Sequence, residues 1–166
     1  MYNQVLDHQF RAIAMAMRSM TRGNLVILDI DETCLDNVPH VRGHARPNDD
    51  IIPECRHLFA AMASAGLKYA FVSGRRERLR RDTIRDLHRA GFLGYEAVAL
   101  CPDDYNGPMW EFKLNARRDL ERRGFVIAAT VGDQVSDLQG GCTGLPFLLY
   151  NPHYYADASG TDIVLL

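Results

Sequence analysis

Two aspartates directly after an apolar segment are the residues of this sequence best placed to do chemistry. Residues 25–28 read Leu-Val-Ile-Leu, and Asp29, Asp31 and Thr33 follow at alternate positions. Side chains two residues apart on a strand point the same way, so we expect both carboxylates at the mouth of a sheet. Neighbouring carboxylates repel one another unless a cation lies between them. The pattern predicts a divalent cation, a nucleophile and a general acid; a strand-end turn with solvated acids is the alternative.

A hydroxyl, a short loop and a lysine farther along the chain are suited to hold phosphate oxygens. Ser73 ends a second apolar segment, Gly74 and Arg75 follow it, and Lys113 lies in a later helical segment. Lysine binds phosphate as a compact cation. Only 2 of the 19 basic residues are lysines, so a lysine at this place is informative. The alternatives are that Ser73 caps the next helix and that Lys113 is an ordinary surface residue.

A second pair of acids follows the apolar segment 125–131. Asp133 comes after Gly132, and Asp137 lies four residues farther on. Carboxylate oxygens are the ligands that Mg²⁺ prefers. Asp133 is therefore expected to join the first aspartates around Mg²⁺, whereas an ordinary exposed acid is the alternative for Asp137.

The elements that must position these residues alternate between strand and helix. Residues 1–22 hold a leading helix over about 3–20, and the first buried strand covers 24–30. The later expected elements are a helix over 53–65, a strand over 68–73, a helix over 76–90, a strand over 96–100, a helix that ends near residue 124, a strand over 125–131, a short helix and a strand over 145–149. Nearly all-apolar strands alternating with helices predict an α/β fold, a three-layer, Rossmann-like parallel sheet with helices on both faces. Right-handed crossovers place the carboxyl ends of its strands on one edge, where the polar residues then meet.

The order of these residues resembles the haloacid dehalogenase-like (HAD) superfamily of phosphohydrolases. Its pattern is Asp-x-Asp-x-Thr, then Ser or Thr, then Lys, then Gly-Asp-x-x-x-Asp. A narrower resemblance is to the branch of bacterial class C acid phosphatases and plant acid phosphatase/vegetative storage proteins. It rests on Asp-Ile-Asp-Glu-Thr-x-Leu-Asp-Asn at 29–37, Gly-Arg-x-Glu at 74–77, Gly-Phe-x-Gly-Tyr at 91–95, Gly-Asp-Gln-x-Ser-Asp-Leu-x-Gly at 132–140 and Asn-Pro-x-Tyr-Tyr at 151–155.

The resemblance implies three catalytic residues. Asp29 would be the nucleophile that becomes an aspartyl-phosphate, and Asp31 would protonate the leaving oxygen and later deprotonate the attacking water. Lys113 would bind the transferring phosphoryl group and offset its charge.

It also implies the residues that bind substrate and metal. Mg²⁺ would be held by the carboxylates of Asp29 and Asp133 and by the backbone carbonyl of Asp31, with Asp137 orienting Lys113 or a metal-bound water. The residues on the substrate side would be Thr33, which would also steady Asp31 or the flap, and Ser73, Gly74 and Arg75.

The domain organisation expected is one HAD-like domain over residues 1–166. Residues 34–50 read as a loop or flap near the site, and inserts of this superfamily usually form the lid that selects substrate. Only about forty residues separate Asp29 from Ser73, and about forty more lead to Lys113, so there is no room for a large cap domain. The site should be open unless a partner subunit in a homo-oligomer covers it.

Composition and charge narrow the classes of partner. The net charge is −2 and no segment is long enough to span a bilayer, which argues against a general nucleic-acid or membrane binder. The arginines over 75–89 alternate with acids and read as a solvated helix face, apart from Arg75. No secretory signal is visible, so a cytoplasmic location is expected. The four cysteines, which form no Cys-x-x-Cys pair, argue against a zinc site and fit a reducing compartment.

Three functions remain open at this point. The leading hypothesis is a Mg²⁺-dependent phosphomonoester hydrolase that acts on a small phosphorylated substrate. The second is a nucleotide or polynucleotide end phosphatase of the same fold, and the third is a non-enzymatic storage or binding protein. Tyr105 and Trp110 could stack a base, pack in the core or anchor a loop. For His40 and His44 we favour solvated residues of the flap over contacts with substrate.

Overall fold

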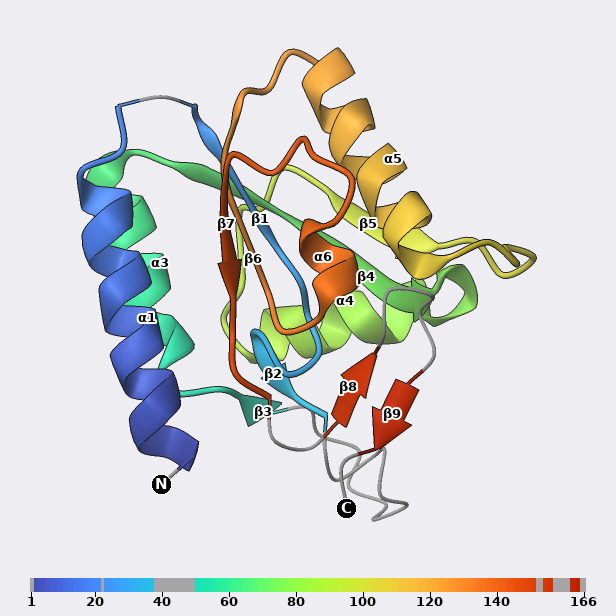
Figure 1. The fold of residues 1–166 in the computed structure, drawn as a ribbon, viewed down its shortest axis with the longest axis horizontal. Coiled ribbons are helices and arrows are strands. Elements are labelled where there is room, and N and C mark those ends of the chain that lie inside the picture. Colours follow the sequence, from blue (N-terminus) through green and yellow to red (C-terminus); the bar gives the residue numbers. More distant parts are fainter. Residues whose placement is uncertain (1, 22, 38–49, 152–153, 157–161, 165–166) are drawn as a thin grey trace.

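A parallel five-stranded sheet forms the centre of the molecule (Figure 1). The computed structural model describes residues 2–21, 23–37, 50–151, 154–156 and 162–164. In spatial order the strands are β5 (Val98–Cys101), β4 (Lys68–Arg76), β1 (Leu25–Leu28), β6 (Ile127–Gly132) and β7 (Leu145–Leu148). All four neighbouring pairs are parallel, which confirms the predicted sheet. The carboxyl end of β1 therefore lies between those of β4 and β6.

Helices cover both faces of this sheet, as the sequence predicted (Figure 1). One face packs against α1 (Tyr2–Arg18), α3 (Cys55–Ala65) and α4 (Arg80–Arg89), and the other packs against α5 (Met109–Arg122) with the short α6 (Val135–Leu138) beside it. None of the described helices is long and apolar enough to span a membrane.

The central strand shows why the first segment is apolar throughout. Val26 and Leu28 belong to the core beneath α1 and α3, whereas Leu25 and Ile27 belong to the core beneath α5. Because side chains alternate along a strand, a strand covered on both faces needs an apolar residue at every position. All four residues are buried, and this burial holds the end of β1 in place beneath the site.

Two of the expected inward-facing residues are in fact exposed. On α1, the helical spacing predicts a buried stripe through Val5, Phe10, Ile13 and Met17; all of these are buried except Val5, which is 39% exposed while its neighbour Leu6 is buried. On the helix expected over 76–90, the spacing predicts a stripe of Leu79, Ile84 and Leu87. Leu79 is instead 42% exposed because it belongs to the 3₁₀ turn Glu77–Leu79 that precedes α4.

The second strand is longer than the sequence predicted. β4 continues to Arg76, which pairs with Cys101 of β5 after a shift in register beyond Ser73. The guanidinium of Arg76 donates to the carbonyl oxygens of Pro102 and Tyr105, at 2.9 and 3.0 Å. These contacts keep the chain after Ser73 extended, so the helix starts at Arg80 rather than at residue 76.

The two ends of the expected flap lie side by side. β2 (Leu35–Asp36) pairs with β3 (Asp50–Ile51) in a short antiparallel sheet. Residues 38–49, with the His40 and His44 of the sequence analysis, lie outside the described residues. The described residues between β1 and α5 contain no large cap domain.

A second antiparallel pair near the end of the chain was not expected. It consists of β8 (Tyr154–Ala156) and β9 (Asp162–Val164). From the sequence we expect Tyr154 and Tyr155 to be packing residues. The side chains of these two strands lie outside the described residues, so this role stays a prediction.

Candidate active site

Three carboxylates meet at the carboxyl edge of the sheet. Asp29 follows β1, Asp133 follows β6, and Asp137 lies in α6. One ligand atom from each lies within 4.8 Å of the others, and all three residues are buried. We call Asp29, Asp133 and Asp137 the acidic group. It brings together residues 108 positions apart (137 − 29), which only the parallel sheet makes neighbours.

A buried lysine lies against the acidic group. Lys113, in α5, places its Nζ 3.1 Å from Oδ1 of Asp29 and 2.5 Å from Oδ1 of Asp137. Burial by itself opposes the ammonium charge, but Asp137 and Asp29 outweigh it and hold the pKa of Lys113 above its usual range. Lys113 is thus a permanent cation within the site and not a surface residue.

Burial has the opposite effect on the carboxyl groups. It raises the pKa of Asp29 well above its usual value, with Lys113 opposing the rise and the neighbouring aspartates adding to it. It also raises the pKa of Asp133 to about 7, helped by Asp137 and opposed by donors from Asn151 and Gln134. Three carboxylates and one ammonium leave two negative charges when all are ionised. A divalent cation with oxygen ligands fits this buried set in both charge and chemistry.

Asp133 is held by three side-chain donors. Thr33 Oγ1 donates to Oδ1 at 3.3 Å, and the amides of Gln134 and Asn151 donate to Oδ2 at 2.5 and 2.8 Å. The hydroxyl of Thr33, which is fully buried, thus contacts Asp133, and a role for Thr33 toward substrate or Asp31 stays a prediction. The sequence analysis assigned no role to Asn151, although its Asn-Pro motif was part of the resemblance.

The end of β6 is shaped to admit the carboxylate of Asp137. Oδ2 of Asp137 accepts a hydrogen bond from the backbone N–H of Gln134 at 2.9 Å. In return, the side chain of Gln134 accepts from the backbone N–H of Asp137, so the two residues form a capping box at the start of α6. A Cβ on Gly132 would overlap the carboxyl group of Asp137. Glycine before Asp133 is therefore a steric requirement of the acidic group.

Asp31 points to a different partner. β1 ends at Leu28 and Glu32 has a positive φ of 55°, so the chain turns and the two-residue alternation of a strand no longer applies. Nε of Arg75 lies 3.0 Å from both carboxylate oxygens of Asp31, and Nη2 lies 2.6 Å from Oδ1. The carboxylate of Asp31 is thus outside the acidic group, and a metal contact through its backbone carbonyl stays a prediction.

The end of β4 that follows Ser73 lies beside this ion pair. Ser73 is buried within β4 and its Oγ accepts from the backbone N–H of Arg75 at 3.2 Å. It does not cap a helix, because the 3₁₀ turn after β4 begins only at Glu77. A Cβ on Gly74 would lie 3.3 Å from the sulfur of Met109, so the start of α5 packs closely over the end of β4.

A fourth buried acid, Glu32, directly follows Asp31 in the first motif. It is 2% exposed, and its Oε1 accepts from the backbone N–H of Asn37 at 2.7 Å. Burial raises the pKa of Glu32 to about 8, with the Asn37 hydrogen bond opposing the rise and Asp36 adding to it. Its position within the first motif is the only signal for it in the sequence.

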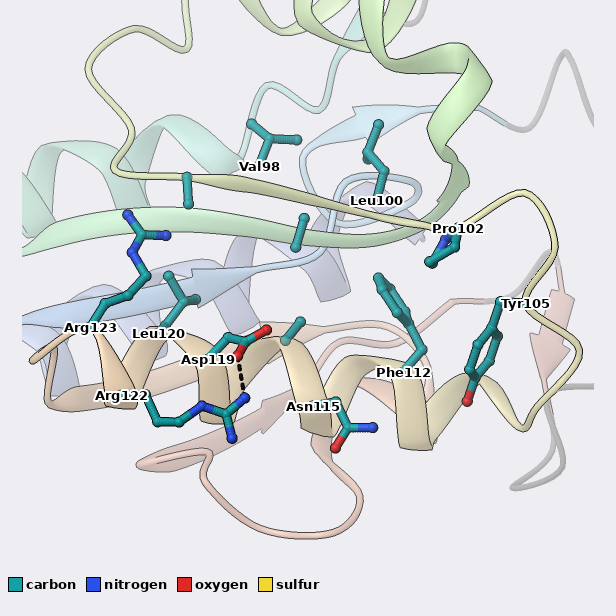
Figure 2. Close-up of a pocket in the computed structure, with 13 residues that line it drawn as sticks. Val98, Leu100, Pro102, Tyr105, Phe112, Asn115, Asp119, Leu120, Arg122 and Arg123 are labelled. Atoms are coloured by element: carbon teal, nitrogen blue, oxygen red, sulfur yellow. Dashed lines mark hydrogen bonds and ion pairs between the residues drawn. The ribbon is translucent and has the colours of Figure 1, made fainter.

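A hollow of about 630 Å³ lies apart from these residues, between β5 and α5 (Figure 2). Its lining includes Ala97, Ala99, Tyr105 and Phe112 but none of the acidic group. The hydroxyl of Tyr105 donates to the carbonyl oxygen of Pro108 at 3.0 Å, so Tyr105 anchors the loop before α5.

Comparison with known proteins gives the family. Residues 42–157 match the family described as HAD superfamily, subfamily IIIB (Acid phosphatase). The chain belongs to this family. The matched range contains Ser73, Lys113, Asp133 and Asp137, and Asp29 precedes it.

Relatives of this subfamily IIIB chain include curated plant proteins. It is 32% identical over 149 residues to the stem 28 kDa glycoprotein of Glycine max, covering 78% of this chain and 59% of the relative. It is 31% identical over 147 residues to acid phosphatase 1 of Solanum lycopersicum, covering 78% and 58%. It is 25% identical over 163 residues to vegetative storage protein 1 of Arabidopsis thaliana, covering 88% and 60%. The chain thus spans about three fifths of the length of these relatives.

Solved structures confirm the HAD fold. The class C acid phosphatase from Bacillus anthracis superposes with a TM-score of 0.65 at 21% identity, covering 93% of this chain and 78% of that one. The cobalt-bound deoxy-D-mannose-octulosonate 8-phosphate phosphatase from Haemophilus influenzae superposes with a TM-score of 0.51 at 23% identity, covering 86% and 72%.

Proposed function

We propose that this chain hydrolyses phosphomonoesters of small substrates with Mg²⁺ through an aspartyl-phosphate on Asp29. The observation that carries the proposal is the position of Asp29 at the end of the central strand. Oδ1 of Asp29 lies 3.1 Å from Nζ of Lys113, and its carboxylate lies close enough to those of Asp133 and Asp137 for the three to bind one metal ion. Membership of the acid phosphatase subfamily supports the reaction class.

In the first step a carboxylate oxygen of Asp29 attacks phosphorus. The bond between phosphorus and the leaving oxygen breaks, and Asp31 gives that oxygen a proton. In the second step water attacks the same phosphorus, Asp31 accepts its proton, and the bond to Asp29 breaks to release phosphate. Each proton that leaves Asp31 is thus returned, and Asp29 ends as a free carboxylate.

Charge is the main obstacle to this reaction, since a phosphate dianion repels an approaching carboxylate. Lys113 contacts Asp29 and is held as a cation, so it offsets part of that repulsion. When bound, Mg²⁺ adds positive charge and keeps Asp29 and Asp133 ionised. Ser73 and Gly74 offer a hydroxyl and backbone donors to the phosphoryl oxygens.

Arg75 links the phosphoryl site to the proton donor. Its ion pair holds the carboxylate of Asp31 in one orientation, with the two side chains 11% and 17% exposed. A phosphoryl group is also a strong acceptor for a guanidinium. We infer that the arriving substrate competes for Arg75 and frees Asp31 to exchange its proton.

A storage or binding role is a further candidate, since storage proteins are among the relatives. The intact set of Asp29, Lys113 and the other acids favours an enzyme, because burying three carboxylates is costly unless they bind a cation.

Hydrolysis of an aryl phosphate by the wild-type chain, Asp29→Asn and Asp119→Asn tests the proposal. Asp119 is an exposed residue of α5 and is the matched control. We expect Mg²⁺-dependent turnover that EDTA abolishes, a loss of roughly 10³-fold or more in Asp29→Asn, and little change in Asp119→Asn. Phosphate label trapped by acid quenching should map to Asp29. Turnover that survives EDTA or the Asp29 substitution would exclude this mechanism.

A comparison of kcat/KM for mononucleotides and for 3′- or 5′-phosphorylated oligonucleotides then distinguishes a small-molecule phosphatase from a polynucleotide end phosphatase. A kcat/KM that is higher for the oligonucleotides would identify a polynucleotide end phosphatase in place of a small-molecule enzyme.

A further inference from the structure

One buried charged residue near the site has no part in the proposed chemistry. Arg117 lies on α5 one turn after Lys113 and is only 1% exposed, the largest fully buried side chain among the described residues. A buried guanidinium is costly unless its donors are satisfied. Its partners therefore indicate what the side chain is for.

Arg117 donates hydrogen bonds to the backbone of Asp137 and of the residues that follow it. Its Nη1 donates to the carbonyl oxygen of Asp137 at 2.5 Å, and Nη2 donates to those of Gln139 at 2.5 Å and Gly141 at 3.0 Å. Nε adds a longer bond to Gly141 at 3.2 Å. One side chain thus joins three carbonyl groups within five residues of backbone.

The local backbone explains why these carbonyl groups converge. Gly140, Gly141 and Cys142 all have left-handed φ angles, of 87°, 90° and 53°, and they follow the single turn of α6 after one extended residue, Gln139. A helix leaves its last carbonyl groups without partners in the helix, and so short a helix can satisfy few of them. Arg117 supplies donors where a longer helix would have supplied backbone N–H groups.

The same segment carries a member of the acidic group. The carboxylate of Asp137 contacts Lys113 at 2.5 Å, while its own carbonyl group is held by Arg117. Two side chains of α5 thus hold Asp137: Lys113 binds its carboxylate, and Arg117 binds its backbone carbonyl group. A shift of this backbone would move the Asp137 carboxylate relative to Asp29 and Asp133.

We infer that Arg117 is a positioning residue that fixes Asp137, and through it Lys113 and the cation site. The inference rests on the proposed function for its catalytic consequence, but its effect on cation binding can be measured without turnover. Outer residues that orient the ligands of a metal typically change metal affinity or activity by roughly 10–100-fold when they are replaced.

Arg117→Met and Arg117→Lys are the direct test. We expect the dissociation constant for Mg²⁺, measured by calorimetry, to rise roughly 10–100-fold in Arg117→Met. The kcat should fall by a similar factor while KM changes less, because substrate contacts remain. Arg117→Lys keeps the charge but not the planar set of donors, and it should recover only part of the loss. Arg122→Met, on the exposed face of α5, should leave cation binding unchanged.

Gly141→Ala tests the same clamp without removing a buried charge. Gly141 and Gly124 have φ angles of 90° and 92°, and an added Cβ meets no atom within 4 Å at either position. Both substitutions therefore carry the same backbone strain, but only Gly141 contacts Arg117. We expect weaker Mg²⁺ binding in Gly141→Ala and wild-type binding in Gly124→Ala, with similar decreases in Tm.

The outcomes separate this inference from the proposed function. A wild-type chain that neither binds Mg²⁺ nor hydrolyses phosphomonoesters contradicts the proposed function. A wild-type chain that does both, with unchanged Mg²⁺ affinity in Gly141→Ala and in folded Arg117→Met, overturns the inference alone. If Arg117→Met does not fold, the pair Gly141→Ala and Gly124→Ala decides the question.

Discussion

At the scale of single residues, the site depends on a balance of buried charges. Asp29, Asp133 and Asp137 would repel one another strongly, and Lys113 offsets only part of their charge. Removing one partner of a buried ion pair lowers the free energy of unfolding far more than removing one partner of an exposed ion pair. The two lysines of the chain offer this comparison directly.

Lys113→Met should inactivate the protein and destabilise it. We expect a loss of about 3–5 kcal/mol in the free energy of unfolding without Mg²⁺, because the buried carboxylates lose their cation. Activity should fall by roughly 10³-fold or more, since the charge facing the phosphoryl group is gone. Urea unfolding and aryl phosphate hydrolysis measure the two effects.

Lys68→Met is the matched control. The Lys68 side chain is 54% exposed and pairs with Glu96 at 3.0 Å, so its replacement should change stability by at most about 1 kcal/mol and leave activity unchanged. Equal losses in both lysine variants would contradict a special role for Lys113.

At the scale of elements, the end of β6 and the start of α6 pack so closely that no side chain fits between Gly132 and Asp137. Gly132 ends β6 at the point where the Asp137 carboxyl group returns against it. The geometry of the acidic group therefore depends on how closely a strand end and a one-turn helix approach each other.

Gly132→Ala should disrupt the site by steric overlap. We expect a destabilisation of about 1–3 kcal/mol from overpacking and a large loss of kcat, since the added methyl group displaces Asp137. Gly66→Ala provides a contrast, because Gly66 ends α3 with a positive φ of 66° and an added Cβ meets no atom within 4 Å. It should cost about 1 kcal/mol through backbone strain and keep full activity per folded molecule. Full activity in Gly132→Ala would show that Asp137 tolerates displacement.

At the scale of the whole molecule, the acidic group couples stability to pH and to Mg²⁺. Burial raises the pKa of Asp133 to about 7, whereas an unfolded aspartate has a pKa near 3.8. Between these values the unfolded chain has lost the proton that the folded chain keeps. The folded state without Mg²⁺ is therefore destabilised as pH rises from about 4 to 7.

Comparison with Asp133→Asn isolates this dependence from that of the other acids. The stability of the wild type relative to Asp133→Asn should fall as pH rises from about 4 to 7 in EDTA and should level off above that range. Saturating Mg²⁺ should stabilise the wild type more at pH 8 than at pH 5, because it binds the ionised carboxylates. Thermal unfolding at fixed ionic strength measures both trends. A relative stability that rises with pH in EDTA would mean that Asp133 is ionised without a cation.

Much of the architecture was predictable because it depends on local patterns. All-apolar strands alternating with helices predicted a parallel sheet, and the topology rules for such sheets placed the ends of the strands that precede Asp29 and Asp133 on one edge. The boundaries were less accurate where tertiary contacts decide them. β4 runs on to Arg76 because carbonyl groups of the loop after β5 accept from its guanidinium.

Residue types and their order along the chain were enough to predict which side chains reach the carboxyl edge. Which of these side chains touch one another depends on how the folded segments meet. Asp31 turned out to face Arg75, 44 residues away, and Thr33 to face Asp133, 100 residues away. No pattern in the sequence predicted that Arg117 would bind the backbone carbonyl group of Asp137. Hydrogen bonds act over about 3 Å, and a pattern of spacing along one chain cannot specify such distances between segments that meet only after folding.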